Sequence, residues 1–149
     1  MTYPKFQTLS FILSFSLSCF SAEIDFVRDV KPILEHNCVS CHREGNVKGN
    51  VRLDTREEAF KGDDVIIAGN PDDSSLYWTT TLPEDDELFM PPITNEEKDY
   101  PLTNSEKKII HEWIKTGANW PNGVELEPQK RLPKQIDFVE HVQPVLELN

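Results

Sequence analysis

Residues 38–42 read Cys-Val-Ser-Cys-His and combine two thiols with an imidazole in a C-x-x-C-H pattern. Two thiols at this spacing can form thioether bonds with the two vinyl groups of one haem, and the imidazole that follows can ligate the iron. The run therefore predicts covalent haem attachment through Cys38 and Cys41, with His42 as the proximal iron ligand.

A C-x-x-C pair by itself also occurs in redox dithiols and in zinc sites. A zinc ribbon needs a second C-x-x-C or paired histidines, and a thioredoxin-like dithiol needs a βαβ framework, and the sequence indicates neither. The remaining cysteine, Cys19, lies in an N-terminal segment that we expect to be removed. Haem attachment is the favoured interpretation, and a dithiol or metal site is the alternative.

A six-coordinate haem needs a second axial ligand, and Met90 is the candidate for it. The other methionine of the chain, Met1, lies in the N-terminal segment. Thioether sulfur favours ferrous iron, and Pro91 and Pro92 restrict the backbone that follows Met90. The alternative is a methionine that fills a gap in the core.

The other histidines are weaker candidates. His36 lies on the helix that enters the motif, on the proximal side, whereas His111 lies on the polar side of a later helix and His141 belongs to a partial repeat. The acidic run Glu84–Glu87 is compatible with a docking patch or a calcium site, although such runs are usually only solvated.

Residues 1–21 have the pattern of a secretory signal peptide. Lys5 precedes the apolar run Phe6–Leu17, and the small residues Cys19 and Ser21 fit cleavage after position 21. The run is shorter than the roughly 20 residues of a transmembrane span, so an uncleaved anchor is the weaker alternative. A lipoprotein anchored through Cys19 is weaker still, because Ser16 stands where a lipobox has Leu. We expect export to the periplasm or another location outside the cytoplasm, where thioether attachment of haem normally takes place.

Apolar spacing predicts two helices that frame the motif. Residues 24–34 have a helical pattern that runs towards the motif, with Pro32 either at a kink or in the first turn of a new helix. Residues 103–117 carry a capping box, formed by Thr103 and Glu106, and one apolar stripe. The second helix should pack across the first one near the haem.

The chain between these helices should contain mostly loops and short elements. We expect a loop over 43–50, an extended piece over 51–54, a brief helix over 55–60, a turn over 69–73 and a helix over 74–82.

The C-terminal part indicates a second unit. Residues 124–135 have the composition of a linker, and residues 136–149 then repeat residues 24–37 at an offset of 136 − 24 = 112 positions. We expect a truncated second cytochrome-like repeat, and hence further domains of a longer chain.

Composition narrows the class of protein. The 149 residues leave room for one domain with a modest core, and 38% hydrophobic residues exclude a bundle of membrane spans. A net charge of −11 argues against nucleic acid or anionic membranes as partners. An acidic electron carrier would attract basic redox partner proteins, although the acidity serves solubility equally well.

Several spaced blocks together resemble a planctomycete-type cytochrome c domain over about residues 24–121. These blocks are 24–34, 38–42, 51–54, 69–71 with 75–77, 90–92, 102–106 and 113–121. One departure is Val51, where a bulkier residue is expected. The resemblance implies an all-α, cytochrome-c-like helical fold with long loops over residues 22–123, around one covalently bound haem c with axial His42 and Met90. It also implies the N-terminal module of a large exported protein.

We therefore expect an exported mono-haem c-type cytochrome that transfers single electrons and is not a catalyst on its own. One alternative is a haem-based ligand-binding or sensing module, in which an external ligand displaces Met90. Another alternative is the electron outlet of a larger multidomain oxidoreductase.

Overall fold

The structure, a computed structural model, describes residues 23–93 and 101–129. The predicted signal segment 1–21 and the predicted repeat 136–149 lie outside these residues, so the division of the chain stays a prediction. Within the described ranges, no helix is both long enough and apolar enough to span a membrane.

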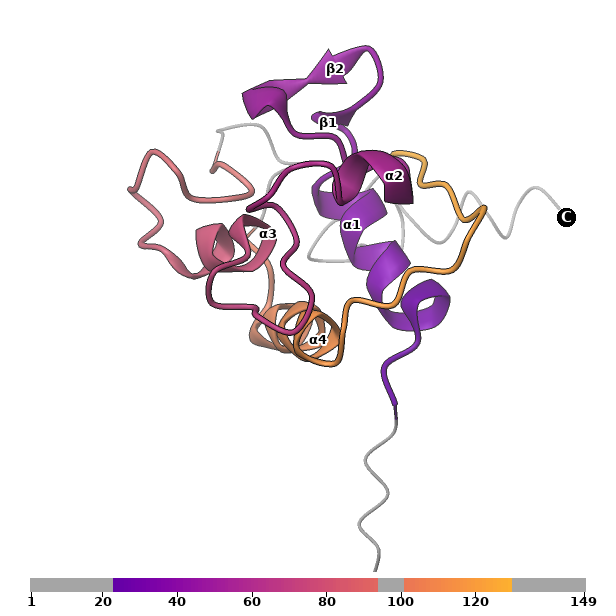
Figure 1. Cartoon of the computed structure of the whole chain (residues 1–149). Helices are drawn as coiled ribbons and strands as arrows, with labels where there is room; N and C mark the ends of the chain where they lie inside the picture. The colour runs from indigo at the N-terminus through magenta and orange to yellow at the C-terminus, as the bar shows by residue number, and fades with distance from the viewer. Residues whose placement is uncertain (1–22, 94–100, 130–149) are drawn as a thin grey trace, which may run out of the picture.

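Short helices joined by long loops make up most of the described chain (Figure 1). The helical elements are η1 (Phe26–Val30, a π-helix), α1 (Lys31–Asn37), η2 (Lys48–Asn50, 3₁₀), α2 (Arg56–Ala59), α3 (Ser75–Trp78), η3 (Thr79–Thr81, 3₁₀) and α4 (Asn104–Lys115). Strands β1 (His42–Arg43) and β2 (Asn46–Val47) form one antiparallel pair. The fold is therefore small and mostly helical, compatible with a cytochrome-c-like domain. The β1–β2 pair is the one departure, among the described residues, from the predicted all-α fold.

The first two helical elements deliver the C-x-x-C-H run. Asp25 caps η1, because its side chain accepts a 2.8 Å hydrogen bond from the Arg28 N–H. α1 follows directly with Pro32 in its first turn, one of the two predicted arrangements. It ends at Cys38, whose N–H donates to the Leu34 carbonyl at 2.9 Å. The last turn of α1 therefore leads directly into the motif.

The segment predicted as a loop over 43–50 instead contains the β1–β2 hairpin and η2. Glu44 and Gly45 form its two-residue turn, and Gly45 has a φ of +80°, a conformation that glycine adopts without steric cost. The His42 carbonyl accepts from the Leu53 N–H at 2.8 Å, which ties the hairpin to the extended segment after it. The polar composition of this stretch predicted a loop, because the hydrogen bond between Leu53 and His42 that stabilises the hairpin is not apparent from local sequence.

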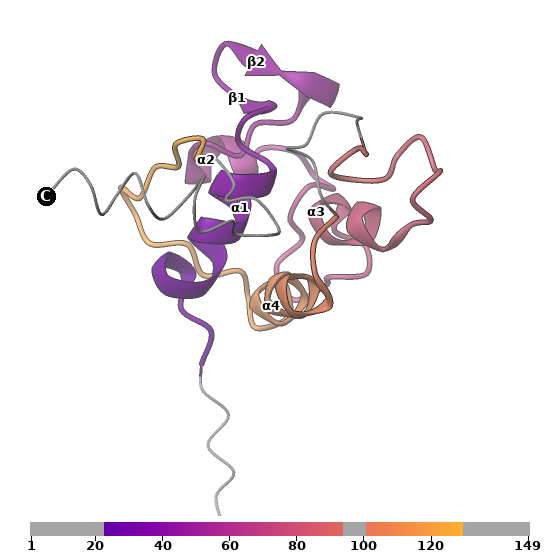
Figure 2. The ribbon, with the colours of Figure 1, turned by 180° about the vertical axis from the view of Figure 1, so that it is seen from behind.

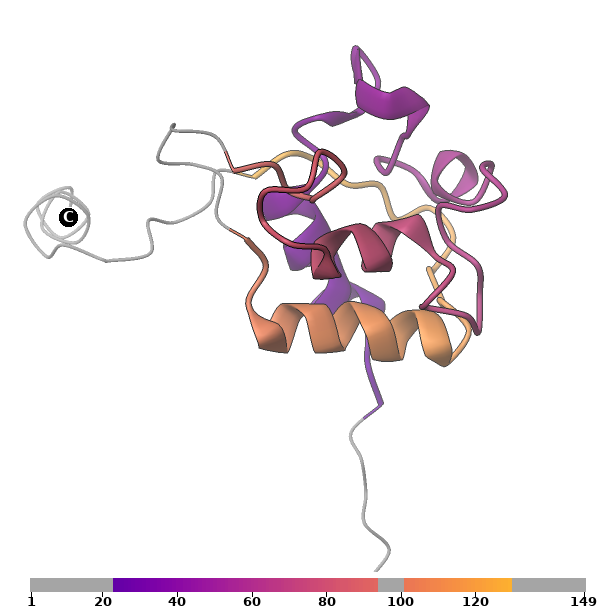
Figure 3. The same ribbon diagram turned by 90° about the vertical axis from the view of Figure 1, so that its left-hand side faces the viewer.

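α4 has the predicted boundaries and the predicted capping box. The Thr103 hydroxyl accepts from the Glu106 N–H at 3.2 Å, and the Glu106 carboxylate accepts from the Thr103 N–H at 2.7 Å. Its buried face packs against η1 and α3, and Figure 3 shows α3 lying along α4. The Trp113 ring lies 5.5 Å from the Phe26 ring, centroid to centroid. Packing of this helix across the first helical segment is confirmed.

The predicted helix over 74–82 is divided between α3 and η3. The Ser74 hydroxyl does not cap α3, because it accepts from the Ile67 N–H at 2.9 Å and donates to the Asn70 carbonyl at 2.7 Å. Threonine hydroxyls in η3 donate to carbonyls three or four residues earlier, and such bonds compete with regular helix geometry. The segment is consequently two short turns.

Residues 124–129 run back along α1, and we call this segment the strap (Figure 2). Leu126 is buried, and its N–H donates to the Asp54 carbonyl at 2.8 Å. The Glu127 N–H donates to the Glu35 carboxylate at 3.0 Å, and the Gln129 N–H donates to the Glu35 carbonyl at 3.0 Å. The first part of the predicted linker thus packs on the domain.

Candidate functional site

An apolar cleft of about 310 Å³ lies between the end of α1, the hairpin and the α3–η3 segment. Its lining comes from four separate parts of the chain, within 37–42, 48–53, 75–80 and 88–92, together with Val65 and Leu102. The volume is at the lower end of the roughly 300–1,000 Å³ that is usual for small-molecule sites. The cleft is therefore the candidate site for the predicted attachment of haem.

Both cysteines of the motif line this cleft. A tight turn brings them together, because the Cys41 N–H and the His42 N–H each donate to the Cys38 carbonyl at 3.1 Å. Each cysteine is partly exposed and lines the cleft. The geometry is suited to attaching one group at two points.

His42 is oriented and kept neutral by its surroundings. Its Nδ1 lies 3.1 Å from the Lys48 carbonyl, so the Nδ1–H donates there and Nε2 carries the free lone pair. Burial lowers the pKa of His42, hydrogen bonds from the ring to the Val51 and Lys48 backbone oppose this, and the charge of Lys48 adds to the lowering. Neutral imidazole is the form that binds a metal.

Met90 lines the same cleft, although a long stretch of chain separates it from the motif. Its N–H donates to the Thr79 carbonyl at 3.1 Å, which anchors the loop to η3. The neighbouring Phe89 is buried and acts as an apolar anchor for this loop. Met90 precedes a cis peptide bond to Pro91. The thioether is thereby placed at the cleft from a segment remote in sequence.

Of the histidines predicted as weaker candidates, His36 and His111 do not line the cleft. His36 Nδ1 bonds to the Pro32 carbonyl at 2.6 Å within the same helix. His111 is half-buried, with its ring 5.0 Å from that of Tyr77 and its Nδ1 3.0 Å from the Glu112 carboxylate. His141 lies outside the described residues.

The acidic run Glu84–Glu87 is exposed and leads into Leu88, which lines the cleft and is 56% exposed. Over 23–93 and 101–129, no three or more His, Cys, Asp or Glu side chains gather into a group that could hold a metal ion. The calcium and zinc interpretations therefore gain no support from this part of the chain.

Sequence reasoning did not foresee the contribution of residues 75–80 to the cleft wall, nor the role of Lys48 beside His42. Among the tryptophans, Trp78 lines the cleft, whereas Trp113 and Trp120 are buried in the core. The lining by α3 could only have been inferred from the Ser75–Tyr77 block of the family resemblance. Nothing local in the sequence indicated the Lys48 contact.

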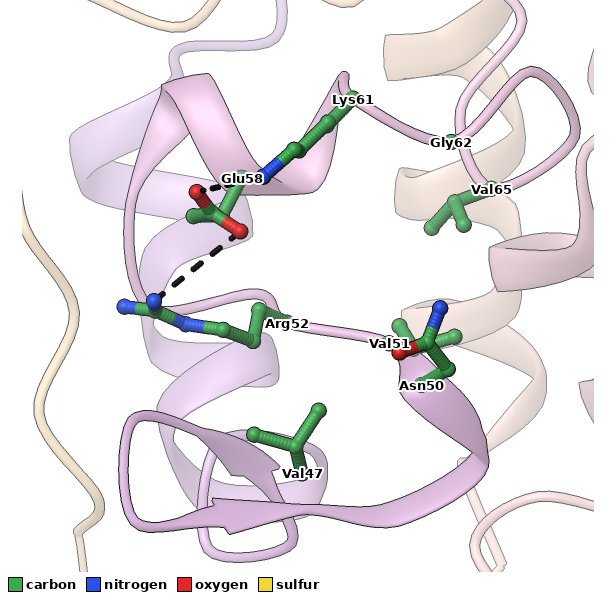
Figure 4. A pocket seen from close by; sticks show the side chains of 8 residues that line it. All are labelled: Val47, Asn50, Val51, Arg52, Glu58, Lys61, Gly62 and Val65. Carbon is green, nitrogen blue, oxygen red and sulfur yellow. Dashed lines mark hydrogen bonds and ion pairs between the residues drawn. The ribbon is translucent and has the colours of Figure 1, made fainter.

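A second, smaller hollow of about 220 Å³ adjoins the cleft, and Val51 and Val65 line both (Figure 4). Its charged side chains pair with each other. Glu58 lies 3.9 Å from an Arg52 guanidinium nitrogen and 3.4 Å from the Lys61 ammonium. This hollow contains no thiol and no imidazole.

The donor set of the larger cleft fits a covalently held haem. Two thiols can attach its vinyl groups, while a neutral imidazole and a thioether are established axial ligands of haem iron. The apolar walls suit a porphyrin, which is itself largely apolar.

Comparison with known proteins supports the resemblance seen in the sequence. Residues 38–93 match the family described as Planctomycete cytochrome C, a stretch that contains the C-x-x-C-H run and Met90. The match confirms the resemblance to a planctomycete-type cytochrome c domain and indicates an electron-transfer haem protein. No curated protein and no solved structure matches the chain at a significant level.

Proposed function

We propose that this chain, whose residues 38–93 match the planctomycete cytochrome c family, is an exported mono-haem electron carrier with His42 and Met90 as axial ligands. One observation carries the proposal: the two cysteines, His42 and Met90 all line a single apolar cleft. Three of these residues are neighbours in sequence, whereas Met90 reaches the cleft only through the fold.

Each of these residues has a distinct task in the proposal. Cys38 and Cys41 hold haem c covalently, His42 binds through Nε2 and Met90 binds through Sδ. The Lys48 carbonyl holds the imidazole in the required tautomer. The bound haem supplies the one-electron chemistry, and the residues of the cleft bury and orient it. No set of catalytic acid, base and nucleophile is needed for this role.

Location and partners belong to the same proposal. The signal-like segment 1–21 supports export, and the net charge of −11 favours basic redox partner proteins. The partial repeat 136–149 supports further domains in a longer chain, to which this domain would pass electrons or from which it would receive them.

The first test is an optical spectrum of the chain co-expressed with a c-haem maturation system. We expect covalent haem and, in the oxidised protein, the weak long-wavelength charge-transfer band of Met–Fe(III) ligation. Met90→Ala should abolish this band but retain covalent haem. Leu88→Ala, which alters another lining residue of the same loop, should keep the band and serves as the matched control.

Three results would change the proposal. Absence of covalent haem from the parent would return the motif to a dithiol or metal site. Haem without the charge-transfer band in either protein would remove Met90 as a ligand. Ready binding of carbon monoxide by the reduced parent at neutral pH would favour the sensing alternative over electron transfer.

A further inference from the structure

The cleft has an uneven distribution of charge. Of the described residues that line it, Lys48 is the one Lys or Arg, and no Asp or Glu contributes to the lining. A haem carries two propionate carboxylates on its edge. A carboxylate beside an apolar wall must either reach solvent or find a cationic partner.

The backbone of Lys48 is fixed beside the attachment motif on both sides. Its N–H donates to the Cys41 carbonyl at 3.1 Å, and its carbonyl accepts from His42 Nδ1 at 3.1 Å. The chain then turns sharply, with φ of +59° at Gly49 and +58° at Asn50. The backbone of Lys48 is therefore held at the cleft, close to the proximal ligand, and its exposed side chain starts from there.

Three cations near the cleft have anionic partners, whereas Arg43, which does not line the cleft, donates to the Glu44 carbonyl at 3.4 Å. Arg52 makes two hydrogen bonds to Asp54, at 3.0 and 2.7 Å, and Lys61 pairs with Glu58 in the adjoining hollow (Figure 4). Lys31 on α1 pairs with Glu35. Over the ranges 23–93 and 101–129, the Lys48 ammonium has no ion-pair partner. Lys48 is thus the cation at the cleft that remains available to a ligand.

We propose that Lys48 is a positioning residue whose ammonium pairs with a propionate of the haem. This inference rests on the proposed function, since it requires haem in the cleft. Its backbone carbonyl orients His42, and its side chain balances charge at the rim. The two roles are separable, because a substitution at position 48 retains the carbonyl.

The test is the midpoint potential of the covalent haem at pH 7 and low salt. Removing the ammonium leaves an unbalanced carboxylate near the iron, which favours the ferric state. Lys48→Gln should therefore lower the equilibrium constant for reduction by up to about tenfold, a downward shift of up to about 59 mV for one electron. Lys48→Arg, which keeps the charge, should stay close to the parent potential.

Lys108→Gln is the matched control, because Lys108 is exposed on α4 and does not line the cleft. An equal shift in Lys108→Gln and Lys48→Gln would reduce the effect to overall charge and overturn the inference, as would an unchanged potential in Lys48→Gln. If haem is not attached to Lys48→Gln, attachment of haem to Lys48→Arg supports the charge role. If haem is not attached to Lys48→Arg either, the charge role is overturned. Covalent haem in the parent, measured first, keeps these outcomes separate from failure of the proposed function.

Discussion

Asp54 joins three parts of the chain next to the candidate site, two through its carboxylate and one through its backbone carbonyl. The carboxylate accepts from Arg52 Nε at 3.0 Å, from Arg52 Nη2 at 2.7 Å and from the Glu44 N–H at 3.0 Å. The hydrogen bond from Arg52 is the main reason that the pKa of Asp54 is lowered. The backbone carbonyl of the same residue accepts from Leu126 in the strap. Asp54 therefore links the hairpin turn, the segment before α2 and the strap.

Asp54→Asn should destabilise the protein at neutral pH and lose this effect in acid. Because the folded-state pKa lies below the usual value of about 3.9, ionised Asp54 stabilises the fold above that pH, and the contribution disappears as pH falls towards the folded-state pKa. We expect a loss of about 1.5–3 kcal/mol at pH 7, the range for hydrogen bonds to charged groups. Urea unfolding of the haem-loaded parent and variant between pH 7 and pH 3 measures this loss of unfolding free energy.

Asp63→Asn is the control for that prediction, because Asp63 is exposed. Its unfolding free energy should match that of the parent at every pH. A constant difference between Asp54→Asn and the parent down to pH 3 would show that the carboxylate charge is not the stabilising feature.

Among the elements, the strap has the clearest structural role beyond the helices that frame the site. It covers α1 through buried Leu126 and through two hydrogen bonds to Glu35, one to its carboxylate and one to its carbonyl. The Lys31 ammonium adds a 3.0 Å hydrogen bond to the Glu125 carbonyl. Because α1 leads directly into the attachment motif, contacts that hold α1 also hold the cysteines in place.

A chain that ends at Gly123 should be less stable than a chain that ends at Gln129. Loss of buried Leu126 alone removes an apolar side chain whose truncation typically costs about 2–5 kcal/mol. We expect a lower urea midpoint for the shorter haem-loaded protein, and the parent's midpoint for the chain ending at Gln129. Equal midpoints for both truncations would support the domain boundary predicted at residue 123.

At the scale of the whole molecule, charge should govern encounter with redox partners. The chain carries a net charge of −11, and the exposed run Glu84–Glu87 precedes Leu88 at the cleft. Complementary charge accelerates diffusional encounter, and salt screens the effect over about 10 Å at 0.1 M ionic strength. The acidic surface is thus expected to select cationic electron donors and acceptors.

The reduced protein should be oxidised faster by a cationic metal complex than by an anionic complex of similar potential. Stopped-flow rates should show a preference that declines as salt is added, because screening weakens the attraction. Neutralising Glu84, Asp85 and Glu87 should reduce the preference more than neutralising the exposed carboxylates Glu57, Asp63 and Asp72. Equal effects of the two triple variants would assign the preference to net charge and not to the loop.

Features that depend only on neighbouring residues could be predicted from the sequence. The C-x-x-C-H spacing, Pro32 in the first turn of α1 and the Thr103–Glu106 capping box each act within a few residues, so their chemistry can be read locally. The family resemblance supported the expected role of Met90, which lies within residues 38–93, the segment that matches the family.

The meeting of distant segments at the cleft, by contrast, became visible in the fold alone. A hydrogen bond from the Met90 N–H to the Thr79 carbonyl holds Met90 at the cleft, and one from the Leu53 N–H to the His42 carbonyl holds the hairpin. The Lys48 carbonyl accepts a hydrogen bond from the His42 ring. The strap, which has the composition of a linker, packs because Leu126 and the Glu35 contacts find partners far away in sequence. These arrangements depend on closing long loops against a shared core, and no local pattern of residues specifies which closure is the most stable.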